Sequence, residues 1–247
     1  MTWIVSQERK ARKPITPRRS LKPRSRGARG PNVVEGLVSP RRASYTCAMA
    51  SLSHFLFTMA HQNQWANHRL LTACAVLSDE DFALPSTSFF PSLKATANHI
   101  LTVDWYYVDA LESALRGTPV RADALQAFFE PEEPFDTCAE IQREQRAVDA
   151  RLVSVCASLR DEDLERPVAV MRRTGVQHES CERLLAHLFE HQIHHRGQMH
   201  AMLAGTRVKP PQLDEFYCAN DAGLRAEELA ALGTSEEAIF GRTLPPR

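Results

Sequence analysis

Apolar side chains recur at alternating steps of four and three residues along much of this chain, which is the spacing of one buried face of a helix. Between residues 52 and 77 the repeat consists of Leu52, Leu56, Met59, Asn63, Ala66, Leu70, Ala73 and Leu77. Between residues 141 and 159 it consists of Ile141, Gln145, Val148, Leu152, Val155 and Leu159. Each repeat predicts one long helix with a single core-facing stripe.

Start and stop signals predict two more long helices. One begins after Pro91 and ends at Gly117, because glycine adopts the left-handed backbone that terminates helices. The other covers about 180–204 and stops at Gly205. The chain therefore carries four helices of bundle-forming length.

The stretches between and after these helices have weaker signals. "PEEPFDT" breaks the chain before the helix over 141–159, with Asp136 or Thr137 as its N-cap. "PVAVMRRTGVQHES" is short and rich in Val, which predicts a small β-hairpin with a Thr-Gly turn, and "RAEELAAL" predicts a short terminal helix. The fold class is therefore all-α: a four-helix bundle with a small hairpin between its third and fourth helices.

Charge divides the chain into two parts, although the net charge is zero. Residues 1–48 contain twelve Lys and Arg against only Glu8 and Glu35, so the rest of the chain is acidic. We expect 1–48 to be a disordered basic arm, since it has little apolar surface to bury, and 49–247 to form the bundle with a C-terminal extension. Three origins of the arm stay open: a nucleic-acid-binding segment, a transit peptide, or translated sequence upstream of a native start at Met49.

Other compositional features exclude several classes of protein. The six cysteines include no C-x-x-C pair, which argues against a thiolate zinc knuckle. No apolar run approaches the ~18 residues of a membrane span, and no secretory signal precedes the helices. We therefore expect a cytoplasmic protein with no membrane partner, and we consider a nucleic-acid partner unlikely because the arm offers only Trp3 and Tyr45 for base stacking.

The segment "HLFEHQIHHRGQ", residues 187–198, holds four of the ten histidines. His191 and His195 stand in the core-facing stripe, where apolar residues precede and follow them. Residues four apart lie ~6 Å apart along a helix axis, so both rings could reach one ion, and neutral imidazole is a common ligand for zinc and nickel. His194 is rotated ~100° from His195, and His187 lies ~12 Å from His195 along the axis. Neither is expected to share the ion with His195.

A third ligand has to come from another histidine. The folded part offers His54, His61, His68, His99, His178 and His200. Antiparallel helices could bring His99 level with His191 and His195, although Asp104 and Tyr107 also fit an inward-facing stripe. His54, His61 and His68 recur every seven residues off the apolar stripe, which indicates a solvated face.

Several neighbours of the histidines have alternative roles. A metalloprotease of the H-E-x-x-H type is excluded because Gln192 follows His191. Arg196 could bind an anionic substrate group, but a solvent-facing arginine is favoured. Gly197 costs ~1 kcal/mol within a helix, which suggests close packing against a neighbouring helix or subunit. Asp104 and Glu190 are candidate hydrogen-bond partners for ligand imidazoles.

These motifs resemble the DinB family of metal-binding four-helix bundles over residues 55–218. The resemblance lies in "QWANHRLLTACAVLSDEDF", "FFPSLKATANHILTVDWYYVDAL", "HLFEHQIHHRGQMHAML" and "KPPQLDEFY". It implies that one divalent metal ion is bound by His99, His191 and His195. The family name records induction by DNA damage, which implies a link to stress response, and members are commonly homodimers. Residues 1–48 have no counterpart in the family pattern.

The resemblance also limits the expected function. Some relatives use the metal to activate a low-molecular-weight thiol, and three imidazoles with open coordination positions are typical of catalytic sites. We therefore expect a metal-dependent enzyme acting on a small molecule, with thiol transfer or isomerisation favoured over hydrolysis and the catalytic residues undefined. The alternative is a non-catalytic, stress-linked bundle whose ion only stabilises the core.

Overall fold

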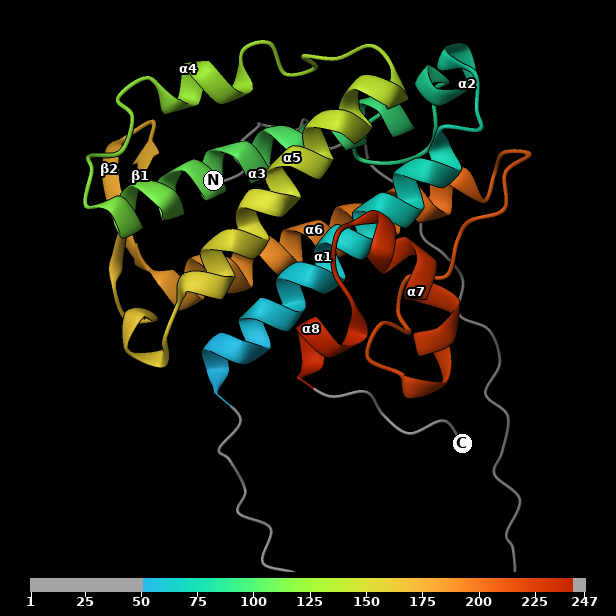
Figure 1. The fold of residues 1–247 in the computed structure, drawn as a ribbon. Helices are drawn as coiled ribbons and strands as arrows, with labels where there is room; N and C mark the ends of the chain where they lie inside the picture. The colour runs from blue at the N-terminus through green and yellow to red at the C-terminus, as the bar shows by residue number, and fades with distance from the viewer. Residues whose placement is uncertain (1–50, 242–247) are drawn as a thin grey trace, which may run out of the picture. The chain divides into compact units, whose positions relative to one another are not determined.

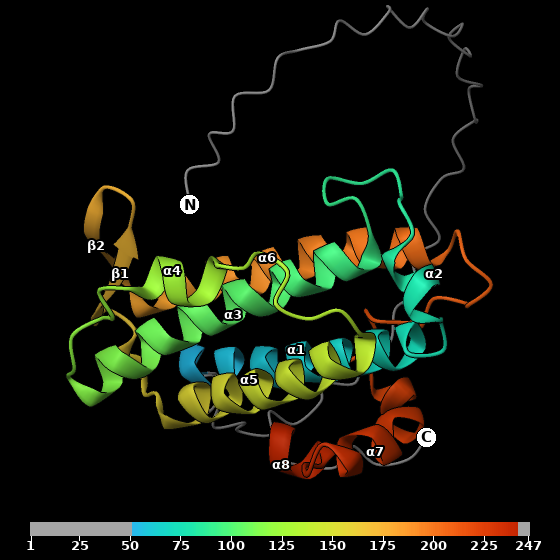
Figure 2. The same ribbon diagram turned by 90° about the horizontal axis from the view of Figure 1, so that it is seen from above.

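The predicted four-helix bundle is confirmed by the computed structural model, which describes residues 51–241; the basic arm predicted over 1–48 lies outside this range. The four long helices are α1 (Leu52–Cys74), α3 (Leu93–Arg116), α5 (Cys138–Ser158) and α6 (Cys181–Leu203) (Figure 1). Both α5 and α6 contact α1 and α3. Figure 2 shows the resulting layers, with α3 beside α6 and α1 beside α5.

The sequence defines the ends of these helices through their caps. Ser51 and Ser92 each accept a hydrogen bond of 3.0 Å from the backbone N–H three residues on, at the starts of α1 and α3. Thr137, one of the two predicted N-caps, begins α5 in a capping box with Glu140. Gly117 ends α3 at the predicted position with a φ of 68°, a left-handed conformation that favours glycine.

The predicted hairpin is present between α5 and α6. Strands β1 (Pro167–Arg172) and β2 (Gly175–Ser180) pair antiparallel, with Arg172 opposite Gly175. The turn therefore consists of Arg173 and Thr174, one residue earlier than the predicted Thr-Gly turn. Gly175 has a φ of 107°, so it allows the chain to enter β2 directly from the turn.

Several short elements carry too few residues to show a periodic pattern, and they were not predicted. They are α2 (Asp79–Ala83), α4 (Ala124–Phe129), the 3-10 turns η1 (Asp161–Asp163) and η2 (Ala219–Asp221), and α8 (Glu236–Phe240). The predicted terminal helix is α7 (Ala222–Ala231). In addition, α1 ends at Cys74, so Leu77 joins the core from the following turn rather than from the helix.

The C-terminal segment packs on α1 through a small apolar cluster of its own. Trp65 of α1 is fully buried against Phe216 and Leu229. Its indole N–H donates a 2.7 Å hydrogen bond to Glu228, and Arg69 forms a 2.7 Å salt bridge with the same carboxylate. α1 is thus covered on a face outside its core-facing stripe.

One prediction for α1 is wrong in part. The expected solvated face of His54, His61 and His68 exists only in part, because His61 is 6% exposed. Its ring contacts Phe57 edge-on at 4.6 Å between centroids, and burial lowers its pKa. The stripe spacing of α1 identified one packed face, whereas the helix is packed on more than one. Within residues 51–241, no helix combines the length and apolarity required to cross a membrane.

Candidate metal centre

The structure brings His99, His191 and His195 together across α3 and α6. One potential ligand atom from each residue lies within 4.8 Å of those from the other two. The Nε2 atoms of His99 and His191 are 3.0 Å apart. The His195 ring centroid lies 4.4 Å from that of His191 and 4.7 Å from that of His99. The sequence prediction that His99 lies level with the α6 pair is therefore met geometrically.

The donor set fits a divalent transition metal. Imidazole nitrogens bind zinc at ~2.0–2.1 Å, so two ligands at a tetrahedral angle lie about 3.3 Å apart. The 3.0 Å separation of His99 and His191 is close to this value. No fourth His, Cys, Asp or Glu among residues 51–241 joins the group. Three protein ligands leave at least one coordination position for a molecule from outside the protein.

The environment of the three rings keeps them in the form that binds metals. Burial, together with the smaller effect of neighbouring imidazoles, lowers the pKa of His191 to about 2 and the pKa of His99 to about 3. Burial also lowers the pKa of His195. All three rings are therefore neutral near pH 7, and each keeps a nitrogen lone pair for coordination.

Gln198 orients one of the three rings, a role that the sequence did not indicate. Nδ1 of His195 lies 2.9 Å from Oε1 of Gln198. When this nitrogen donates the hydrogen bond, Nε2 of His195 carries the lone pair and is available to an ion. Nε2 of Gln198 lies in turn 3.0 Å from Nε2 of His194, so His194 holds the amide in place.

The two partners predicted for the imidazoles were wrong. Asp104 accepts hydrogen bonds from Gln145, at 2.6 Å, and from Gln192 instead. Glu190 is exposed on α6. Nδ1 of His191 is buried and has no hydrogen-bond partner.

The other two histidines of the cluster lie as predicted. His194 is exposed on the flank of α6 and is outside the three-residue group. His187 is also outside the group, with its ring centroid 6.3 Å from that of His191 and 5.4 Å from that of Tyr107.

An aromatic residue covers one side of the triad. The ring of Phe90 lies 4.2 Å from that of His99 and 5.5 Å from that of His195, between centroids. Phe90 belongs to the turn before α3, which is closed by a 2.7 Å backbone hydrogen bond from Ser86 to Pro91. The candidate site therefore has an apolar wall.

Arg196 is not solvent-facing as expected, because it is 3% exposed and lies inside the bundle. Its Nη1 donates hydrogen bonds to Asn67 at 3.0 Å, to Gln192 at 3.1 Å and to Asn63. α6 packs against α1 on this side, so a residue one position beyond the stripe is buried as well. Arg196 is therefore unavailable to an anionic substrate at the surface.

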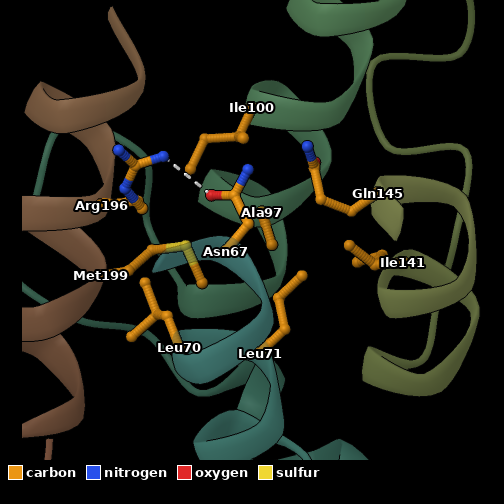
Figure 3. Close-up of a pocket in the computed structure, with 9 residues that line it drawn as sticks. All are labelled: Asn67, Leu70, Leu71, Ala97, Ile100, Ile141, Gln145, Arg196 and Met199. Carbon is orange, nitrogen blue, oxygen red and sulfur yellow. Dashed lines mark hydrogen bonds between the residues drawn. The ribbon is translucent and has the colours of Figure 1, made fainter. Parts of the chain in front are cut away.

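Two carboxylates complete this polar core. Asp149 accepts hydrogen bonds of 3.2 Å from Asn63, 3.0 Å from Asn67 and 3.1 Å from Gln145. Burial raises the pKa of Asp149 and of Asp104, while the charge of Arg196 opposes that rise. A void of about 10 Å³ adjoins the network beside Met199 and Ile100 (Figure 3).

The close helix packing predicted at Gly197 is absent within the described chain. Gly197 is exposed, and a Cβ atom added to it would meet no atom within 4 Å, so no close packing against a helix of the described chain requires glycine there. A contact with a second subunit stays a prediction.

A helical bundle with three converging histidines belongs to the class of bundles whose core can hold a metal ion. The DinB family model matches residues 50–227, and the chain belongs to the DinB family. The chain is 24% identical over 155 residues to "Protein DinB" of Bacillus subtilis (strain 168), covering 62% of this chain and 86% of that protein. It also resembles the crystal structure of a DinB-like protein from Bacillus cereus ATCC 10987, with 20% identity, a TM-score of 0.44, and coverage of 60% of this chain and 90% of that one.

Proposed function

We propose that this chain binds one divalent metal ion, zinc or nickel, through His99, His191 and His195 and acts as an enzyme on a small molecule. The observation that carries the proposal is the group of three neutral imidazoles that no fourth described residue joins. A structural zinc site has four protein ligands, whereas a catalytic one keeps a position open.

Thiol transfer is favoured over hydrolysis. A divalent cation lowers the pKa of a bound thiol or water by several units. The protein contributes orientation through Gln198, which holds His195, and an apolar wall through Phe90. An apolar wall beside the open position suits a thiol and a non-polar electrophile better than water.

The five cysteines of the described residues are all free thiols. We propose a reducing, cytoplasmic setting on this basis, since such a compartment keeps both these cysteines and a low-molecular-weight thiol reduced.

The test uses the full-length protein as isolated, after chelation, and after reloading with Zn²⁺ or Ni²⁺. Thiol consumption is followed with glutathione or cysteine and 1-chloro-2,4-dinitrobenzene, and hydrolysis with a p-nitrophenyl ester. We expect metal-dependent thiol consumption that is absent in His191→Ala and retained in His194→Ala. Full metal occupancy without activity in either assay would support the non-catalytic alternative, in which the ion only ties α3 to α6.

A further inference from the structure

Arg172 is a half-buried cation that has no acidic partner in the described part of the chain. It ends β1 and lies over two rings of α3, with its Cζ 5.6 Å from the ring centroid of Tyr107 and 5.9 Å from that of Tyr106. It forms no ion pair with any residue that the structure describes, whereas Arg166, just before the same strand, pairs with Asp163 at 2.6 Å. The positive charge of Arg172 is therefore available to an anion from outside this part of the protein.

Two contacts hold the guanidinium in place. Its Nη1 donates a 3.2 Å hydrogen bond to the hydroxyl of Tyr107. The hydroxyl of Tyr106 donates to the carbonyl of Met171, which fixes the end of β1 on α3. A guanidinium has five N–H donors, so the two tyrosine hydroxyls can accept only part of them. Arg172 thus presents positioned, charged donors, and their planar arrangement matches a carboxylate.

A row of side chains connects Arg172 with the triad. Tyr107 contacts His187 edge-on with 5.4 Å between ring centroids, and the ring of His187 lies 6.3 Å from that of His191. His187 is exposed, so a ligand can lie against it. Figure 2 shows the hairpin that carries Arg172 at one end of the layer formed by α3 and α6. Arg172 and the triad therefore lie along the same two helices.

The spacing along α3 indicates the length of a ligand that reaches both. Tyr107 follows His99 by eight residues, which is a rise of ~12 Å along the helix axis. One residue of an extended peptide spans at most ~3.6 Å, and three span roughly 10 Å. A metal–sulfur bond adds ~2.3 Å. A thiol of cysteine size bound to an ion at the triad is therefore too short to contact Arg172, whereas one of tripeptide length is long enough.

We propose that Arg172 binds a carboxylate of the thiol that the metal activates, so that the substrate is an acidic thiol of about tripeptide length. This inference rests on the proposed function, because the sulfur of the thiol binds the ion held by the triad. The carboxylate at the other end accepts hydrogen bonds from the guanidinium. A neutral thiol lacks this second contact, and a thiol of cysteine size cannot reach it.

Calorimetric titration of the full-length, Zn²⁺-loaded protein tests the proposal. Glutathione carries a carboxylate at each end of a tripeptide-length chain, and its diethyl ester lacks both charges. We expect glutathione to bind about tenfold more tightly than the ester, which is the typical contribution of one charged hydrogen bond. Equal affinities, or no binding of glutathione to the loaded protein, would overturn the proposal.

Substitutions in the hairpin localise the contact. Arg172→Met should weaken the binding of glutathione about tenfold and leave that of the ester unchanged. Its matched control is Arg173→Met, which removes an exposed arginine from the next position and should leave both affinities unchanged. Arg172→Lys keeps the charge but not the planar donors, so it should restore part of the affinity that the Met variant loses.

A purely structural role of Arg172 gives a different result. If Arg172 only held the hairpin on α3, Arg172→Met would weaken both thiols equally, and that outcome would overturn the proposal, as would unchanged binding of glutathione. N-Acetylcysteine carries its carboxylate on the residue that carries the sulfur, so its affinity should be the same with and without Arg172. A tenfold loss for N-acetylcysteine would refute the length assigned to the ligand.

Metal content and activity, measured on the same samples, separate this inference from the proposed function. A chain that binds no metal would contradict the proposed function and this inference with it. A loaded, active protein that binds glutathione and its ester equally would contradict only the role of Arg172. With 1-chloro-2,4-dinitrobenzene, a neutral electrophile, Arg172→Met should raise KM for glutathione about tenfold and leave kcat unchanged.

Discussion

His195 and Arg196 are consecutive in the sequence, yet they belong to two polar clusters with opposite chemistry. Around Arg196, donors meet acceptors: its guanidinium bonds to amide oxygens, and the amide N–H groups bond in turn to Asp149. Around His195, three groups of the same kind converge, and Nε2 of His99 faces Nε2 of His191 at 3.0 Å.

The kind of partner that surrounds a buried polar residue indicates whether folding alone explains its burial. Partners within the chain satisfy the Arg196 guanidinium and the Asp149 carboxylate, so folding explains their burial, although Oδ1 of Asp104 and Oε1 of Gln145 have no hydrogen-bond partner. The three converging imidazoles are neutral nitrogen ligands of one kind, which is a donor set that suits a divalent transition metal. A bound divalent cation, as proposed above, would use the lone pairs of all three rings at once.

The largest expected effect is the loss of metal when a triad residue is removed. His99→Ala, His191→Ala and His195→Ala should each contain little or no metal after purification, because two imidazoles hold a divalent ion far less tightly than three. Metal content per chain, measured by inductively coupled plasma mass spectrometry, checks this. His194→Ala is the control and should retain the ion, and a fully loaded His99→Ala, His195→Ala double variant would refute the assignment.

Removal of Arg196 should affect the other cluster instead. Arg196→Met leaves two buried carboxylates without their counter-charge, and breaking such a pair costs about 3–5 kcal/mol of unfolding free energy. Chemical denaturation followed by circular dichroism measures the change. The metal content of the remaining folded protein should be unaltered, so a parallel loss of metal would show that the two clusters are not separate.

A smaller effect is expected from the partner of His195. Gln198→Leu removes the hydrogen bond that orients the ring, and such changes typically weaken metal binding by about 10–100-fold. Competition with a chromogenic chelator measures the affinity. Gln198→Asn, with a shorter amide, should restore part of it, and wild-type affinity in Gln198→Leu would exclude an orienting role.

The smallest effect concerns the pH dependence of stability. Burial raises the pKa of Asp149 above its ordinary 3.8. At a pH between 3.8 and the raised pKa, the folded chain therefore holds a proton that the unfolded chain has released. The contribution of Asp149 to the free energy of unfolding is thus greatest below pH 3.8 and is lost as pH rises through the folded-state pKa. Asp149→Asn should remove this decline, changing the unfolding free energy near neutral pH by about 1 kcal/mol. Parallel pH profiles of the variant and the wild type would contradict it.

The sequence predicted one of the two clusters because only one has a recognisable motif. His191 and His195 replace apolar residues at helical spacing, and the family resemblance supplied His99. The cluster around Arg196 is less evident in the sequence. Asn63 and Gln145 occupy positions in the apolar stripes of their helices, which indicates that they are buried but not which residues they bond.

The remaining features depend on packing between distant segments. Arg196 lies outside the stripe of α6, and its burial follows from the contact of α6 with α1. The burial of His61 and the short helices α2, α4 and α8 have no periodic signature at all. Gln198 could have been found from its position three residues after His195, where side chains of one helix meet.

The attachment of the C-terminal segment has a practical consequence for trimming this protein. The family match ends at residue 227, one residue before the carboxylate of Glu228 that holds both Trp65 and Arg69. A chain cut at that boundary would also lose Leu229 and Ile239, which cover the indole. In the trimmed bundle Phe216 and Arg69 would still contact the indole, but the part that Leu229 and Ile239 bury would become exposed apolar surface, so we expect more self-association even though every helix of the bundle is intact. We therefore expect a chain shortened to this boundary to lose solubility before it loses its fold.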